Sequence, residues 1–262
     1  HATVKQSVYL NSLASWDSQG VLNDTIIPKN VSDTLYNKIV AIRPNKPDTS
    51  FTSIDLIANT TLFPKGTYFH VYKGSYTATV NLARDSCVLY FDAESRISKT
   101  TGLSMFDYSA ITKGCDVLGY GTFKISSTCL NIINTTDPFY LPYSLTFEAD
   151  SVISSTSGIT ISSNSSVNMK IHSFLVSGGD ALHILGNGTK ADIKIVNLIA
   201  TGGKALKLAS QTNSINCNYN GSYISSNTYG VYAVGNLNIN CPYIIGTTAA
   251  MYTEAGLYYN II

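Results

Sequence analysis

Apolar and polar residues alternate in short segments that recur along the C-terminal half of the chain. Four segments share the pattern: 158–161, 181–184, 205–208 and 230–233. Their first apolar residues, Ile159, Leu182, Leu206 and Val231, recur with a period of about 24 residues. The hydrophobic period within each segment is two, which predicts short strands and argues against amphipathic helices.

A second short strand recurs inside the same unit, at 193–195, 215–217 and 239–241. A unit of about 24 residues with two or three strands cannot bury its apolar side alone. Stacking solves this, because every strand then pairs with its equivalent one turn away. The sequence therefore predicts an all-β fold, a parallel β-helix with about 24 residues per turn. The spaced Leu and Asn pattern of a leucine-rich repeat is absent.

The coil is predicted to continue upstream, where 89–98 matches 145–154 and would place Phe91, Phe123 and Phe147 in one internal stack. Before these turns stands the segment 63–69, Phe-Pro-Lys-Gly-Thr-Tyr-Phe. It resembles the entry into the right-handed β-helix of the pectin lyase-like superfamily, which includes polysaccharide lyases, polygalacturonases and viral tailspikes. The resemblance covers residues 55–262 and implies a right-handed coil. It implies little about function, because such folds carry enzymes and inert scaffolds alike.

Two domains are predicted from where the repeat begins. Residues 1–54 show no repeat and are expected to form an irregular N-terminal cap or assembly segment, and 55–262 the β-helix. A cap is needed because the end of a β-helix exposes unpaired strand edges. The apolar segment 257–262 shows no such cap, so we expect the C-terminal edge to be open to a partner, with a second copy of the chain as the leading candidate.

The composition narrows the classes of partner. Only 13% of residues are charged and the net charge is +1, which excludes a polybasic surface for nucleic acid. No stretch reaches the roughly 18 apolar residues that a membrane span needs. The polar residues are mainly hydroxyls and amides, which favours an extracellular, cell-surface or virion location. His1 is expected to be either the start of a mature form without its signal peptide or an engineered start. Seven sequons permit N-glycosylation, at Asn23, Asn30, Asn59, Asn134, Asn164, Asn187 and Asn220.

The five cysteines show neither zinc-ligand nor thioredoxin-type spacing, and no metal or cofactor is expected. Cys217 and Cys241 are separated by one period of the repeat and stand in similar contexts, which predicts equivalent places on neighbouring turns. Adjacent strands lie about 4.8 Å apart, within the range that a disulfide can bridge. A disulfide and a stack of two buried thiols are both compatible with this spacing.

Outward residues of the repeated strands predict a polar column on one face of the coil. Its expected members are Ser104, Asn131, Thr160, His183, Lys207 and Tyr232. The column is either a glycan-contact groove or an ordinary solvated sheet face. Asp180 and His183 are an acid and an imidazole close in sequence, so they are weak candidates for general acid–base chemistry. Asp180 is equally compatible with a structural role in a turn, in which its side chain accepts a hydrogen bond from the nearby backbone.

Other charged positions give two weaker hypotheses. Lys170 and Lys194, with Asn216 and Asp192, are expected on another face, where they could steer an anionic polymer. Asp92 and Glu148 are the nearest approach to the paired carboxylates of glycoside hydrolases. The predicted register puts Lys124 between them, which favours a salt-bridged ladder over a catalytic pair.

Polygalacturonase-like members of the superfamily carry a Gly-His-Gly and an Arg-x-Lys segment, and neither occurs in this chain. We therefore expect a structural or adhesive β-helix subunit, self-assembling and in contact with glycans. One alternative is a secreted or tailspike-type polysaccharide lyase or glycoside hydrolase. A second alternative is a monomeric carbohydrate-binding module.

Overall fold

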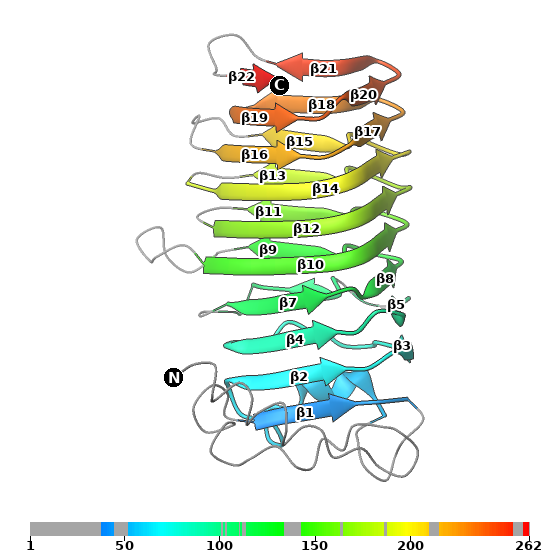
Figure 1. Cartoon of the computed structure of the whole chain (residues 1–262), viewed down its shortest axis with the longest axis vertical. Coiled ribbons are helices and arrows are strands. Elements are labelled where there is room, and N and C mark those ends of the chain that lie inside the picture. Colours follow the sequence, from blue (N-terminus) through cyan, green and yellow to red (C-terminus); the bar gives the residue numbers. More distant parts are fainter. Residues whose placement is uncertain are drawn as a thin grey trace, which may run out of the picture.

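The computed structural model describes residues 38–44, 52–100, 102, 104–109, 111, 114–133, 143–162, 165–185, 188–209, 215–253 and 259–261. In these residues the strands stack in parallel into a β-solenoid of about 7 turns, with equivalent strands about 24 residues apart. The all-β parallel β-helix predicted from the repeat is confirmed. Figure 1 shows the strands piled one above another along the long axis of the molecule.

Three faces run along the coil. The first face is the ladder β1 (Lys38–Ile42), β2 (Thr67–Val71), β4 (Cys87–Phe91), β7 (Cys115–Gly119), β10 (Tyr143–Ser154), β12 (Ser165–Val176), β14 (Lys190–Ala200), β16 (Asn216–Asn220), β19 (Asn236–Asn240) and β22 (Tyr259–Ile261). The third face is a separate seven-stranded sheet of β6 (Phe106–Asp107), β9 (Leu130–Ile133), β11 (Ile159–Ser162), β13 (Leu182–Leu185), β15 (Leu206–Ala209), β18 (Tyr229–Val234) and β21 (Ala249–Thr253).

The second face connects these two and shares strands with the first. It contains β3 (Gly74–Thr77), β5 (Ser95–Lys99), β8 (Thr122–Ile125), β17 (Tyr223–Ser226) and β20 (Tyr243–Gly246). Between β8 and β17 the long strands β10, β12 and β14 pass from the first face into the second, so that β14 pairs with β16 and then with β17. In the middle turns, therefore, one bent strand covers two faces. At the two ends of the coil, separate shorter strands cover them.

Phenylalanine rings from different faces fill the interior. Phe123 of β8 lies 5.0 Å from Phe91, 5.3 Å from Phe106 and 5.9 Å from Phe147, between ring centroids. All four side chains are fully buried. Phe91, Phe123 and Phe147 all lie in the interior, as predicted, but the predicted stack is wrong, because the three residues do not occupy equivalent positions on successive turns. Phe106 of the third face completes the cluster.

The predicted register is confirmed on the third face and wrong on the first. Ile159, Leu182, Leu206 and Val231 lie opposite one another on successive strands. On the first face, however, Ile193 lies opposite Tyr219, and not opposite Ile215. The number of residues between equivalent first-face strands is uneven, because the connections from the third face to the first differ in length. Six residues separate β15 from β16, whereas a single glycine separates β18 from β19.

The coil begins earlier than residue 54, because β1 pairs in parallel with β2. The five-residue 3-10 helix η2 (Ile54–Ala58) follows and buries Ile54 and Ile57 in the core. Most of the predicted cap, residues 1–37, lies outside the described part. Within the described part no helix is long and apolar enough to cross a bilayer.

Candidate functional site on the third face

The outward side chains of the third face form the predicted column. Thr160 lies opposite Asn131 and His183, and Lys207 lies opposite His183 and Tyr232. The order arises because short strands with alternating buried and less buried residues stack in register. The prediction that Ser104 belongs to the column is wrong. Ser104 is buried, and Asp107 is the residue that lies opposite Asn131. At the other end Tyr252 extends the column beyond Tyr232.

Asp180 precedes β13 and pairs with the next turn of chain at two points. Its Oδ1 accepts a hydrogen bond of 2.8 Å from the backbone amide of Lys204, and its Oδ2 lies 3.0 Å from Nζ of Lys207. Burial alone would raise the pKa of this carboxyl, but the Lys204 amide and the Lys207 ammonium outweigh it and lower the pKa below its usual value. Asp180 is therefore a carboxylate near neutral pH, which suits a binding role better than that of a general acid.

His183 lies beside this ion pair without joining it. Its Nε2 is buried and has no hydrogen-bond partner among the described residues. Burial is the main cause that lowers the pKa of His183 to about 4, and the neighbouring Lys207 ammonium lowers it further. The imidazole is therefore neutral near pH 7, with an unsatisfied nitrogen. The predicted Asp180 and His183 residues are neighbours in the site but form no hydrogen-bonded acid–base pair.

Acidification is expected to destabilise the protein through His183. Its pKa is about 4 in the folded protein against 6.5 for an unperturbed histidine, so the unfolded chain binds a proton that the folded chain does not. Stability attributable to this group is present above pH 6.5 and falls as the pH drops toward 4. We expect His183→Gln to flatten urea-unfolding free energies between these two pH values. The exposed His172→Gln is the matched control, and an equal flattening by both variants would contradict the assignment.

Three tyrosines and a lysine surround the C-terminal end of the column. The rings of Tyr232 and Tyr252 stack at 4.8 Å and 11°, and Tyr229 lies 5.7 Å from Tyr232 and 5.9 Å from Tyr252. Nζ of Lys204 lies 5.0 Å from the Tyr232 ring centre. Sequence reasoning found only Tyr232, because the last unit is shorter than the others and the repeat period passes over Tyr252.

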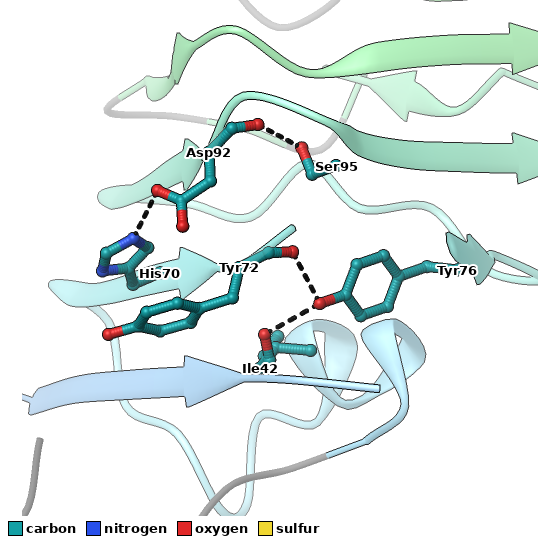
Figure 2. A network of polar contacts seen from close by, with 6 residues as sticks. All are labelled: Ile42, His70, Tyr72, Tyr76, Asp92 and Ser95. Atoms are coloured by element: carbon teal, nitrogen blue, oxygen red, sulfur yellow. Dashed lines mark hydrogen bonds and ion pairs between the residues drawn. The ribbon is translucent and has the colours of Figure 1, made fainter. Parts of the chain in front are cut away.

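A second polar network near the N-terminal end was not predicted (Figure 2). Nε2 of His70 lies 2.8 Å from Oδ1 of Asp92 one turn away, and the imidazole stacks on Tyr72 at 4.0 Å. The hydroxyl of the buried Tyr76 lies 2.7 Å from the carbonyl oxygen of Tyr72 and 3.0 Å from that of Ile42, and can donate to either. These contacts join the first turns of the coil to one another, which gives the network a stabilising role.

The predicted carboxylate ladder is wrong. Asp92 binds His70, and Glu148 binds Lys170 with Oε1 and Nζ 2.8 Å apart. Lys124 lies on the second face, opposite Ser98 and Ile153. The cause is again the uneven register, which moves Lys124 away from the first face.

The premise for a Cys217–Cys241 disulfide is also wrong. Cys217 lies opposite Leu237, which precedes Cys241 on the same turn, and all five cysteines are buried free thiols. Burial raises the pKa of Cys217 to about 12. The cysteines that do lie opposite each other on neighbouring strands are Cys87 and Cys115. The repeat period could not reveal them, because their separation in the sequence is longer than one period.

Two of the predicted sequons fall on described residues. Asn59 is half-buried, and its Oδ1 accepts hydrogen bonds from the amides of Thr61 and Leu62. Asn220 is exposed on β16. The other five, Asn23, Asn30, Asn134, Asn164 and Asn187, lie outside the described residues.

The site combines two cations, a carboxylate and a neutral imidazole with the aromatic faces of the tyrosines. The charged and imidazole groups belong to Asp180, His183, Lys204 and Lys207. No group of three His, Cys, Asp or Glu side chains suited to a metal occurs among the described residues. A scan against protein-family models finds no match, and searches of curated proteins and of solved structures find none. The chain is a parallel β-solenoid on the strength of its own strand register.

Proposed function

We propose that the chain is an extracellular or virion-surface structural and adhesive β-helix subunit that contacts glycans through its third face. The observation that carries the proposal is the tyrosine cluster of Tyr229, Tyr232 and Tyr252 next to the Asp180–Lys207 ion pair. Tyr252 is 40% exposed, so an aromatic surface is available at the end of the column. Sugar rings pack against such faces, while hydroxyls find donors and acceptors on the neighbouring side chains.

Glycan binding is tested by an oligosaccharide array followed by calorimetry on any glycan that binds. We expect Tyr252→Ala and Tyr232→Ala each to weaken binding by about tenfold, because both rings belong to the proposed contact surface. Tyr120→Ala is the matched control, since Tyr120 is 64% exposed but directly follows β7 of the first face. Unchanged affinity in both third-face variants, or no glycan bound at all, would refute the proposal.

Self-association through the C-terminal turn is the second part of the proposal. The strands β20, β21 and β22 each have a described partner on one side only, namely β17, β18 and β19. On β20 the side chains of Tyr243 and Ile245 are 65% and 50% exposed. A strand edge that pairs with no described strand, and that carries exposed apolar side chains, favours strand addition by another copy.

Light scattering after size exclusion tests the association. We expect an oligomer or filament for the unmodified chain and a shift to monomer for Ile245→Lys, because a charge on an edge strand opposes strand addition. Ser225→Lys, on the neighbouring inner strand β17, is the control. A strict monomer at all concentrations would contradict this part and favour a monomeric carbohydrate-binding module.

Membership in the pectin lyase-like superfamily is likewise a proposal, supported by the 63–69 segment and the parallel coil. The polysaccharide lyase or glycoside hydrolase alternative has less support. Asp180 is held as a carboxylate by Lys207, and no hydrogen bond joins it to His183 among the described contacts. Turnover of a polysaccharide that is lost in Asp180→Asn would revive the enzymatic alternative.

A further inference from the structure

A shallow groove crosses the first face, and polar side chains alternate with apolar ones along its lining. It has a volume of about 390 Å³ and spans four successive strands, β12, β14, β16 and β19. These strands lie directly above one another in Figure 1. Three spacings of about 4.8 Å give the groove a length of about 14 Å along the axis.

The groove exists because outward residues stack in two parallel columns. Alternate residues of a strand point to opposite sides, so the columns are two residues apart and strand backbone forms the floor between them. One wall is Asn168, Asp192, Asn218 and Asn238, and the other is Lys170, Lys194, Asn220 and Asn240. All of these side chains are exposed.

The first wall is ordered by a ladder of amide hydrogen bonds. Nδ2 of Asn218 donates to Oδ1 of Asp192 at 2.7 Å, and Nδ2 of Asn238 donates to Oδ1 of Asn218 at 2.8 Å. Each bond uses one of the two amide hydrogens and one of the oxygen lone pairs. Every amide of the ladder therefore keeps a second hydrogen and a second lone pair, in fixed orientation, at intervals of about 4.8 Å.

The second wall contains two lysines on neighbouring strands. Lys170 lies directly opposite Lys194, and Glu148 neutralises Lys170 alone. In the part of the chain that the structure describes, no acidic side chain pairs with Lys194. Lys194 is therefore the lysine of this wall whose charge an anionic ligand group could neutralise.

These features select one class of ligand. Two lysines are too few for the phosphate contacts of a nucleic acid, and among the described lining residues no aromatic side chain points outward for a base to stack on. Amide arrays that both donate and accept match hydroxyl groups, which do the same. We propose that the groove binds a short acidic oligosaccharide along the coil axis, with its hydroxyls on the asparagine walls and a carboxylate on Lys194.

The proposal is independent of the third-face site and of the tyrosines. It does conflict with one sequence prediction, because Asn220 is both a sequon and part of a groove wall. A glycan attached to Asn220 would occupy the groove itself. The test therefore uses the full chain produced in bacteria without N-glycosylation.

The probe is an array of uronic-acid oligosaccharides and their neutral counterparts with the same linkages. We expect binding of acidic members in preference to neutral ones, and an affinity about tenfold lower in Lys194→Gln, because a charged hydrogen bond is lost. Asn218→Leu should weaken the same binding by interrupting the ladder. Lys190→Gln is the matched control, an exposed lysine on the same strand outside the groove.

Tyr252→Ala separates this site from the third-face proposal. Acidic glycans that bind Tyr252→Ala normally but bind Lys194→Gln weakly would assign the binding to the groove. The proposal is overturned if no acidic oligosaccharide binds, if neutral members bind equally well, or if Lys194→Gln and Lys190→Gln behave alike.

Discussion

Phe123→Ala is expected to lower the free energy of unfolding by about 3–5 kcal/mol. Phe123 is fully buried and contacts rings from three other strands in the coil interior. Removing it deletes an aromatic side chain and leaves a cavity between rigid stacked turns, which have little freedom to collapse. Equilibrium urea unfolding, followed by circular dichroism, measures the change.

Two further variants serve as comparisons for Phe123→Ala. Phe123→Leu keeps most of the volume and is expected to cost less than the alanine variant. Leu175→Ala removes an apolar side chain that is 37% exposed and should have a small effect. A Phe123→Ala midpoint equal to that of Leu175→Ala would mean that the aromatic cluster does not stabilise the coil.

Gly158→Ala is expected to be the second most damaging change, with a cost of about 3 kcal/mol or more. A Cβ at this position would lie 2.2 Å from the carbonyl oxygen of Ala181 and 2.4 Å from Cζ of Phe174. The Gly158 amide also donates to the carbonyl of Asp180 at 3.1 Å, so the added methyl group would push neighbouring turns apart just before the third face. The oxygen is backbone and cannot rotate away.

The same variant has a local readout besides stability. Because Asp180 and Ala181 lie against Gly158, separation of these turns should weaken glycan binding at the third face, as calorimetry would detect. The exposed Thr156→Ala, two residues earlier, is the control. A Gly158→Ala protein as stable as Thr156→Ala would show that the turns can separate without cost, against the close packing described above.

Features that neighbouring residues encode could be predicted from the sequence. Alternation of apolar and polar residues predicted the strands, and the near-constant spacing of Ile159, Leu182, Leu206 and Val231 predicted the third-face register. The column from Asn131 to Tyr232 followed from that register, because stacking equivalent strands also stacks their outward side chains. The wrong pairing of Cys217 with Cys241 came from extending one period to every face.

The sequence by itself thus determined the parallel coil and one of its faces, whereas only the tertiary structure decided which first-face residues meet. Ala191 lies opposite Cys217, and Cys217 lies opposite Leu237, so one turn of the first face is longer than the repeat period and the next is shorter. The difference in turn length lies in the connections between strands. These connections carry no hydrophobic pattern from which their effect on the register could be predicted. Three features depend on this uneven register or on packing between turns. They are the His70–Asp92 contact, the asparagine ladder and the buried nitrogen of His183.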